Sequence, residues 1–331
     1  MVAQINSLYI RTRAYKFFSR LISYACFEGR PLTTRGRWIN PFIFTLFDII
    51  KRMPQRKIVK KPLFIIGTGR SGTTILGIVM SMHRNVGYLN EPKALWHAIY
   101  SFEDLIGSYS RGDALYRLNE SHVSEKIKRY AHRLYGAYLW IIGSERVMDK
   151  YPEMIFRAPF VKSIFPDAKF LFLVRNGWDT CVSISEWSKN KGKQFKGENH
   201  DWWGVDKRKW HYLVNQLVSR DPAFKSIFPE IRTFEEQTDM AAVEWIVTMR
   251  EGLTLMKTMP DSIMMVRYED LTCRPVQTLC NIFNFADLGM DRTCLNYGKH
   301  VLSPKSMRAP FDMHPSLRPI FDDTMRWLDY L

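Results

Sequence analysis

Beyond residue 61, short apolar runs alternate with segments in which apolar side chains repeat at helical spacing. Apolar runs of strand length occupy 63–66, 168–174 and 262–266, and helical patterns follow at 75–82, around 182–184 and at 274–285. Buried strands that alternate with helices are typical of a parallel sheet covered by helices on both faces. The pattern therefore predicts an α/β fold, with three α/β/α layers around a central parallel sheet.

The first 61 residues follow a different pattern and predict a helical arm ahead of that domain. Apolar residues recur at helical spacing over 5–26 and again from Pro41 to Ile50, with a turn-rich link over 30–40. We therefore expect the chain to divide into a basic helical N-terminal arm, residues 1–61, and a main domain, residues 62–331.

Positive charge is concentrated in this arm. It holds thirteen basic and two acidic residues, so that +11 of the formal net charge of +15 belongs to residues 1–61. Two interpretations stay open. Either the helices lie on an anionic membrane surface that attracts them, or they pack on the main domain and leave their charges in water.

The overall composition excludes several classes of protein. Hydrophobic residues make up 46% of the 331, too many for a disordered chain. The five cysteines form no CxxC pair and the eight histidines show no metal-binding spacing, so we expect no metal and no disulfide framework. No nucleic-acid-binding motif is present. Since the sequence shows neither a membrane span nor a signal peptide, we expect a cytoplasmic protein that is soluble or bound to a membrane surface.

Residues 189–204 are polar and contain glycines, with Trp202 and Trp203 near one end. A long polar segment of this kind is either a mobile lid over a site or a plain surface loop. The sequence favours neither interpretation.

The main candidate for chemistry is a glycine-rich turn between a strand and a helix, from Phe64 to Thr74. Backbone N–H groups at such a helix start converge on an anion. Gly67 and Gly72 have the spacing of a Walker A loop, but Thr73 stands where that loop has its lysine. The segment thus predicts a P-loop-type fold that binds a phosphate without a conventional Mg·ATP site.

This loop resembles that of the sulfotransferase family, whose sulfonate donor is 3′-phosphoadenosine 5′-phosphosulfate (PAPS). The similarity is closest to the Golgi-type branch of carbohydrate and tyrosylprotein sulfotransferases, in which arginine precedes Ser-Gly, but we see no membrane anchor of the kind that branch carries. The resemblance extends over about residues 62–290 and implies a PAPS-dependent enzyme without a metal. The residues implied to hold the 5′-phosphosulfate are Gly69, Arg70, Ser71, Gly72, Thr73 and Thr74.

A second segment resembles the family's 3′-phosphate site. Arg175 follows the strand at 168–174, and Ser183 lies on the next helix, where the two side chains can converge on one phosphate. Tyr268 corresponds to a family position that touches the nucleotide, although a capping turn with Asp270 as N-cap explains that segment equally well. The polar and basic residues at 303–308 are a weaker candidate for a segment that closes over the donor.

Sulfonate transfer needs a base for the acceptor hydroxyl and cations for the departing charge. Glu91, at the end of a short strand over 86–90, resembles the carboxylate base of the Golgi-type branch, although Lys93 and Ala94 are inserted before its Leu-Trp-His segment. Lys150 resembles the family lysine that stabilises the transferring sulfonate, and Arg70 is expected to help it. The cytosolic branch has a histidine base two residues after that lysine, where this chain has Pro152, so Glu91 is the preferred base.

These residues predict a PAPS-dependent sulfotransferase that acts on a hydroxyl acceptor by in-line attack. The segment from Glu91 to His97 favours a carbohydrate or glycolipid acceptor, and the latter would suit a basic arm at a membrane. A tyrosine or phenol acceptor stays open. The rival functions are a P-loop kinase of a small metabolite and a non-enzymatic protein that binds acidic polymers or lipid.

Overall fold

The computed structural model describes residues 4–31, 33–34, 36–195 and 197–331, and within these residues one five-stranded and one three-stranded sheet form. The larger sheet is parallel throughout and has the strand order β2-β3-β1-β4-β8. Its strands are β1 (Leu63–Gly67), β2 (Val86–Asn90), β3 (Arg146–Lys150), β4 (Lys169–Val174) and β8 (Ile263–Arg267). The smaller, antiparallel sheet contains β5 (Lys193–Phe195), β6 (Glu198–Asp201) and β7 (Gly204–Val205).

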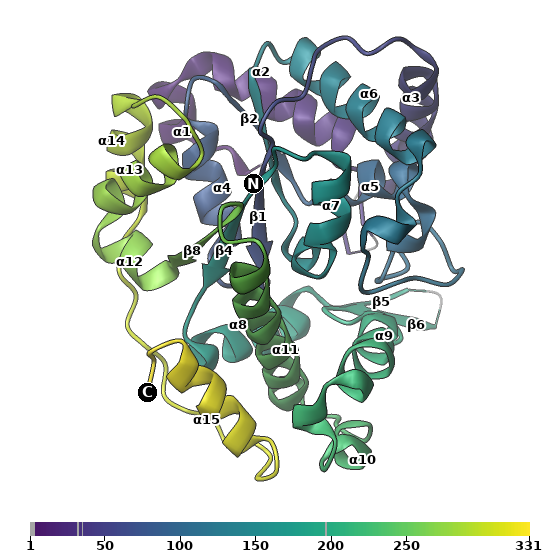
Figure 1. The fold of residues 1–331 in the computed structure, drawn as a ribbon, viewed down its shortest axis with the longest axis vertical. Helices are drawn as coiled ribbons and strands as arrows, with labels where there is room; N and C mark the ends of the chain where they lie inside the picture. The colour runs from purple at the N-terminus through teal and green to yellow at the C-terminus, as the bar shows by residue number, and fades with distance from the viewer. Residues whose placement is uncertain (1–3, 32, 35, 196) are drawn as a thin grey trace.

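Helices cover both faces of the larger sheet (Figure 1). The helices of the described residues are α1 (Ser7–Thr12), α2 (Ala14–Ile22), α3 (Asn40–Arg52), α4 (Thr73–Ser81), α5 (Lys93–Ile99), α6 (Glu125–Ile141), α7 (Ala158–Ile164), α8 (Gly177–Lys191), α9 (Arg208–Gln216), α10 (Phe228–Ile231), α11 (Gln237–Thr258), α12 (Tyr268–Cys273), α13 (Pro275–Phe285), α14 (Arg292–Val301) and α15 (Arg318–Trp327). A π-helical turn, Ser23–Phe27, follows α2, and a 3₁₀ segment, Pro152–Arg157, precedes α7.

Alternate residues of the central strands belong to two separate hydrophobic layers. In β1, Phe64 and Ile66 pack with α5, α6, α8 and α11, whereas Leu63 and Ile65 pack with α4, α13 and α14. Successive side chains of a strand point to opposite faces, so both faces are buried and the runs are apolar throughout. The predicted α/β fold with a central parallel sheet is confirmed.

The N-terminal arm is part of this packing. Phe27, Ile43 and Phe47 belong to the larger hydrophobic layer, and Tyr9 belongs to the smaller one. The first predicted helix is interrupted: Arg13 has an extended φ of −156° between α1 and α2, and α2 ends in the π-turn at Ser23. One continuous helix over 5–26 was therefore wrong, because Arg13 turns away to form an ion pair with Asp291.

Residues 189–204 are not the plain surface loop that was one of the two interpretations, and their position as a lid over a site stays a prediction. Helix α8 continues to Lys191, and the remainder, apart from residue 196 outside the described residues, forms the antiparallel strands β5 and β6 and the turn into β7. Trp203 is fully buried against Trp210. The polar sequence concealed these strands because they are short and their outer side chains face water.

Candidate active site

The glycine-rich turn joins β1 to α4 and is confined by two aromatic rings. A Cβ added to Gly69 would lie 2.4 Å from the Trp202 ring, and one added to Gly72 would lie 2.3 Å from the Tyr268 ring. Gly72 also has a φ of +92°, and Arg70 has a φ of +70°. Only glycine accepts both the close ring and the left-handed backbone at position 72. The turn thus presents the first N–H groups of α4 to one side, as an anion-binding loop does.

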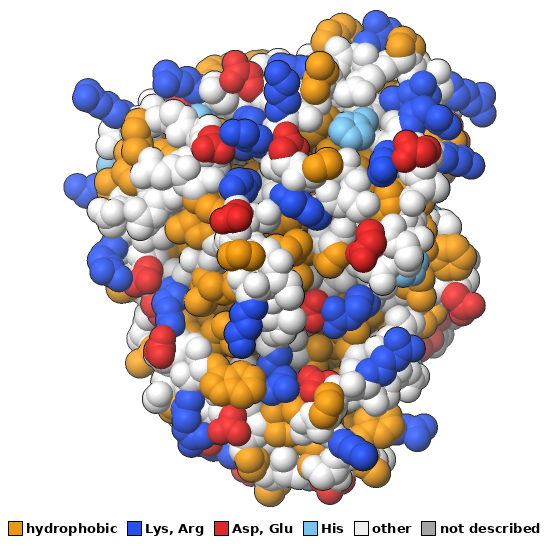
Figure 2. Space-filling model, viewed as in Figure 1, with side chains coloured by type: hydrophobic (Ala, Val, Ile, Leu, Met, Phe, Trp, Pro, Cys, Tyr) orange, Lys and Arg blue, Asp and Glu red, His pale blue; other side chains and the backbone are white. Residues whose placement is uncertain are grey.

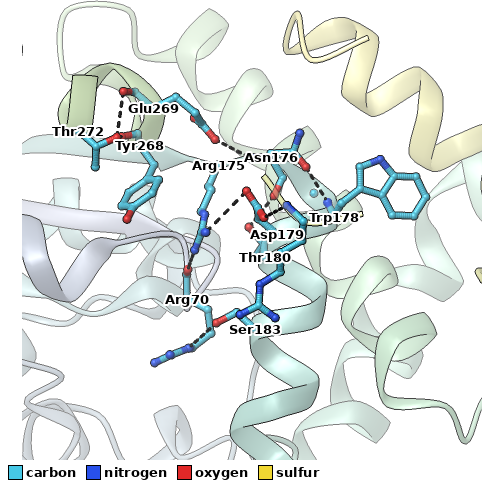
Figure 3. A network of polar contacts seen from close by, with 12 residues as sticks. Arg70, Arg175, Asn176, Trp178, Asp179, Thr180, Ser183, Tyr268, Glu269 and Thr272 are labelled. Atoms are coloured by element: carbon cyan, nitrogen blue, oxygen red, sulfur yellow. Dashed lines mark hydrogen bonds and ion pairs between the residues drawn. The ribbon is translucent and has the colours of Figure 1, made fainter. Parts of the chain in front are cut away.

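Arg70 and Arg175 come from different segments and converge beside this turn (Figure 3). Arg70 Nε donates a hydrogen bond to Ser183 Oγ at 3.2 Å, and Arg175 Nη1 donates to the Arg70 carbonyl oxygen at 3.1 Å. The Arg175 guanidinium also lies over the Tyr268 ring, 4.6 Å from its centroid. Burial and the neighbouring Arg175 charge lower the pKa of Arg70, so an anion placed between the two would be stabilised.

Three buried polar atoms of this region have no hydrogen-bond partner within the described residues: Thr68 Oγ1, Ser71 Oγ and Arg175 Nε. Buried polar groups are normally paired, and an unpaired one points to a ligand. These atoms and the two arginines suit a phosphorylated ligand. The groove that Arg70 and Arg175 line has a volume of about 900 Å³ and is also lined by Ser303, Lys305 and Arg308 of the C-terminal tail.

Glu91 and Lys150 meet at the carboxyl ends of β2 and β3. Lys150 Nζ donates to Glu91 Oε1 at 2.5 Å, and the Glu91 backbone N–H donates to the Lys150 carbonyl oxygen at 2.7 Å. Lys93 Nζ lies 3.6 Å from Glu91 Oε2. Burial by itself raises the pKa of Glu91, but the two lysines outweigh it and the net pKa is lowered, so the side chain is a carboxylate at neutral pH.

This pair lines a second cavity of about 400 Å³ that shares Arg70, Thr73 and Thr74 with the groove. The two cavities therefore meet at the glycine-rich turn. Each candidate residue predicted from the sequence lines one or both cavities except Ser71, which is fully buried. Gly69 lines the second cavity, and Gly72 and Tyr268 line the groove.

The second cavity contains a row of charges that the sequence did not reveal. Lys93 Nζ lies 3.8 Å from Glu153 Oε1, which lies 3.3 Å from Lys209 Nζ. Lys209 in turn contacts Glu244 at 2.6 Å, and Glu244 accepts a hydrogen bond from Trp202 Nε1 at 2.6 Å. Lys93 and Lys209 lower the pKa of Glu153 to about 2 against the effect of burial. The inserted Lys93 was a visible signal, whereas Lys209 of α9 reaches the cavity, and the buried Glu244 of α11 contacts Lys209, only through folding.

The N-terminal arm forms one wall of the same cavity. Tyr24, Glu28, Arg30, Pro31 and residues 33–34 line it. The Glu28 carboxylate forms a buried ion pair with Arg20 and accepts a hydrogen bond from the Asn90 backbone N–H at 2.8 Å. The arm is thus joined to the residue that precedes Glu91.

Within the described ranges, no cluster of three or more His, Cys, Asp or Glu side chains is arranged around a common metal position. No helix among the described residues has the length and apolar character needed to cross a bilayer.

Known proteins with similar sequences are sulfotransferases or include one. A model of the sulfotransferase family matches residues 62–224. The nodulation protein NoeE of Sinorhizobium fredii is 27% identical over 142 residues, 40% of this chain and 34% of that protein. The protein-tyrosine sulfotransferase of Drosophila melanogaster is 21% identical over 248 residues, 74% of this chain and 42% of that protein. The matches thus span well under half the length of these two relatives.

The fold has a counterpart among solved structures. A sulfotransferase domain from the curacin biosynthetic pathway superposes with a TM-score of 0.51 at 15% sequence identity, and the match covers 83% of this chain and 99% of that domain. The matched residues 62–224 include the glycine-rich turn, Glu91, Lys150 and Arg175. Through these residues, the chain is similar to the sulfotransferase family.

Proposed function

We propose that this chain is an enzyme that transfers a sulfonate group from PAPS to a hydroxyl group of an acceptor. The observation that carries the proposal is the meeting of two cavities at Arg70, Thr73 and Thr74. One cavity is a basic groove lined by Arg175, whose buried Nε has no hydrogen-bond partner among the described residues, and the other contains the Glu91–Lys150 pair. A transferase needs its donor and acceptor sites to adjoin in this way.

The groove supplies the groups that a doubly phosphorylated nucleotide requires. Arg175 and Ser183 would hold the 3′-phosphate, and the Tyr268 ring would contact the nucleotide. PAPS supplies the sulfonate when it is bound. The 5′-phosphosulfate would be held by the N–H groups and side chains of Gly69, Arg70, Ser71, Gly72, Thr73 and Thr74.

Glu91 is the proposed base. Its ionised carboxylate would accept the proton of the acceptor hydroxyl as the hydroxyl oxygen forms its bond to sulfur. Lys150 and Arg70 would stabilise the negative charge that remains on the departing phosphate oxygen. The contact of Lys150 with Glu91 at 2.5 Å supports this division of roles, because one lysine can hold the base and face the transferred group.

The acceptor is proposed to be a saccharide or a glycolipid. The second cavity, which we call the acceptor cavity, is lined by the Trp187 and Trp202 rings and by alternating lysines and glutamates. Aromatic faces and charged hydrogen-bonding groups together suit a polyhydroxyl ligand. A glycolipid would be met at a membrane surface, which we propose that residues 1–61 contact. A tyrosine or phenol acceptor is the second candidate, since one relative is named a protein-tyrosine sulfotransferase.

Binding of 3′,5′-adenosine bisphosphate, measured by calorimetry against ADP and ATP with and without Mg²⁺, tests the donor site. We expect metal-independent binding of the bisphosphate, weakened by Arg175→Ala through the loss of a charge-assisted contact by about tenfold or more. Trp327→Gln, on the distant helix α15, is the matched control and should bind as the wild type does. A preference for Mg·ATP would establish the kinase alternative instead.

The base is tested by Glu91→Gln in an acceptor screen that begins with saccharides. The amide keeps the shape of the side chain but cannot take a proton, so turnover should fall by a factor of about 10² or more. Affinity for the bisphosphate should change little, because Glu91 faces the acceptor cavity. Wild-type turnover in this variant would show that another group is the base.

A further inference from the structure

Helix α2 packs with its charged side inward. Lys16 and Arg20 are 2% and 3% exposed, and Lys16 Nζ donates to the Val86 carbonyl oxygen at 2.6 Å. Tyr15 and Phe18 are 53% and 66% exposed on the other side. An amphipathic helix on a protein surface normally faces water with its polar side. In α2, two of the charges that the sequence suggested for membrane attraction are instead buried against the protein, and the apolar side of the helix is exposed.

Helix α3 is apolar on both of its sides. Ile43 and Phe47 face the core and are 2% and 0% exposed. Trp38, in the turn before the helix, Phe42 and Ile49 lie on the opposite side and are 75%, 67% and 54% exposed. The outer side of α3 thus presents large apolar side chains next to the polar Thr45, Asp48 and Arg52. Apolar side chains on the outer side of a surface helix are available to a partner surface.

This exposure is concentrated in the arm. Eight of the seventeen large hydrophobic side chains that are exposed in the described part of the chain belong to residues 8–58. Helices α1, α2 and α3 lie along the end of the molecule that is opposite α15 (Figure 1). We name the exposed side chains of this end the apolar end patch, which consists of Leu8, Ile10, Tyr15, Phe18, Trp38, Phe42 and Ile49.

The charges around the patch are predominantly positive. Arg11, Arg37, Arg52 and Arg56 are exposed, and none of them has an ion pair among the described residues. Asp48, the acidic side chain on α3, is already paired with Lys51 at 2.7 Å. Lys and Arg side chains gather at this end of the molecule in Figure 2. Exposed aromatic side chains together with arginines that form no ion pair among the described residues match the boundary between headgroups and acyl chains of an anionic bilayer.

We propose that the apolar end patch docks on an anionic lipid surface, with Phe18, Trp38 and Phe42 inserted at the interface and the surrounding arginines on the headgroups. The inference rests on the proposed contact of residues 1–61 with a membrane and assigns it to particular side chains. It differs from a purely electrostatic attachment, because the insertion of aromatic side chains resists salt.

Sedimentation of the full-length protein with vesicles tests this assignment. The vesicles contain phosphatidylcholine alone or with about 30 mol% phosphatidylserine. We expect binding to the anionic vesicles that is weakened but not abolished in about 0.5 M salt. The triple variant Phe18→Gln/Trp38→Gln/Phe42→Gln should lose affinity by about tenfold or more, because it removes the inserted rings while keeping every charge.

The control variant is Trp327→Gln, which removes an aromatic ring that is 54% exposed at the opposite end of the molecule. It should sediment as the wild type does. Equal sedimentation of the triple variant and the wild type would overturn the proposal, as would the absence of binding to anionic vesicles. A lipid-free dimer that the triple variant converts to monomer would instead assign the patch to a second copy.

Bisphosphate binding in the same preparations separates this result from the donor site. The triple variant should bind 3′,5′-adenosine bisphosphate with wild-type affinity, because none of its three positions lines the groove. Lost vesicle binding with intact nucleotide binding would support the patch. Failure of nucleotide binding in the wild type would contradict the proposed function without affecting the lipid assignment.

Discussion

At the scale of single residues, two neighbouring side chains at the end of β3 lie in different surroundings. Successive side chains of a strand point to opposite faces, so Asp149 lies in the apolar layer and Lys150 lines the proposed acceptor cavity. Asp149 Oδ2 accepts hydrogen bonds from Tyr135 Oη at 2.5 Å and Trp96 Nε1 at 2.8 Å. Burial raises the pKa of Asp149 to about 7 despite these bonds.

This raised pKa predicts a pH-dependent stability. The folded state holds the Asp149 proton more tightly than the unfolded chain, whose reference pKa is 3.8, so this group makes the protein less stable as pH rises from about 4 to about 7. Asp149→Asn keeps an oxygen acceptor and removes the titration. Urea unfolding at several pH values measures the free energy of unfolding of both proteins. As pH rises from about 4 to about 7, this free energy should increase in the variant relative to the wild type by at most about 1.4 kcal/mol per pH unit. Parallel pH profiles for the two proteins would contradict the raised pKa.

The backbone at Glu91 shows a second residue-scale feature. Its φ is +50°, a left-handed conformation that is uncommon for a residue other than glycine. The hydrogen bond from its N–H to the Lys150 carbonyl oxygen holds the turn, and Pro92 follows directly. Strain of this kind is typical of functional sites, and here it aims the carboxylate at Lys150.

At the scale of elements, a buried ion pair joins the arm to β2. Arg20 of α2 and Glu28 after the π-turn are 3% and 4% exposed, and Glu28 also accepts the Asn90 N–H. The conservative change Glu28→Gln should lower the free energy of unfolding by about 3–5 kcal/mol, because it leaves the Arg20 charge buried without its counter-ion. Denaturant titration measures this loss.

A double variant controls for the loss of charge. Arg20→Met with Glu28→Leu removes both charges and should recover much of the stability lost in Glu28→Gln, since an apolar pair avoids an unpaired buried ion. If the double variant were the less stable of the two, the ion pair would not be the cause of the effect.

At the scale of the whole molecule, the arm cannot be separated from the rest of the fold. It contributes buried side chains to both hydrophobic layers and lines the acceptor cavity. A chain that lacks residues 1–55 should therefore lose its cooperative thermal transition or aggregate, because deletion uncovers apolar surface on α5 and α6 that α3 covers. Calorimetry of the truncated chain is the measurement. An unchanged melting temperature would show that the arm does not contribute to the stability of the fold.

The residues of the proposed donor site are ones that the sequence suggested. The glycine-rich turn, Arg175, Ser183 and Tyr268 lie close to buried strands, and the ends of parallel strands meet at one edge of a sheet. The position of these residues after predicted strands was therefore enough to suggest that their side chains lie close together. The contact between Arg70 and Ser183 adds the geometry that links the two phosphate segments.

The acceptor cavity depended on contacts between distant segments. Lys209 and Glu244 lie on α9 and α11, yet they meet Glu153 and Trp202 in one row of charges. Nothing in the spacing of these residues distinguishes them from the charges of ordinary surface helices. The short strands β5 to β7 were missed for a similar reason, since their three-residue pairing is fixed by packing rather than by propensity.

The sequence by itself determined the parallel sheet and the phosphate-binding turn, because alternating apolar periods and a glycine-rich strand-to-helix junction are local patterns with few structural solutions. Tertiary structure alone decided which side of each arm helix faces the protein. A helical periodicity states that a helix has two sides but not which one is buried, and in α2 the buried side is the charged one. The Val86 carbonyl oxygen accepts a hydrogen bond from Lys16, and the Glu28 carboxylate forms an ion pair with Arg20. Because these interior partners stabilise the two buried charges, the charged side of α2 faces the protein and the apolar side is exposed.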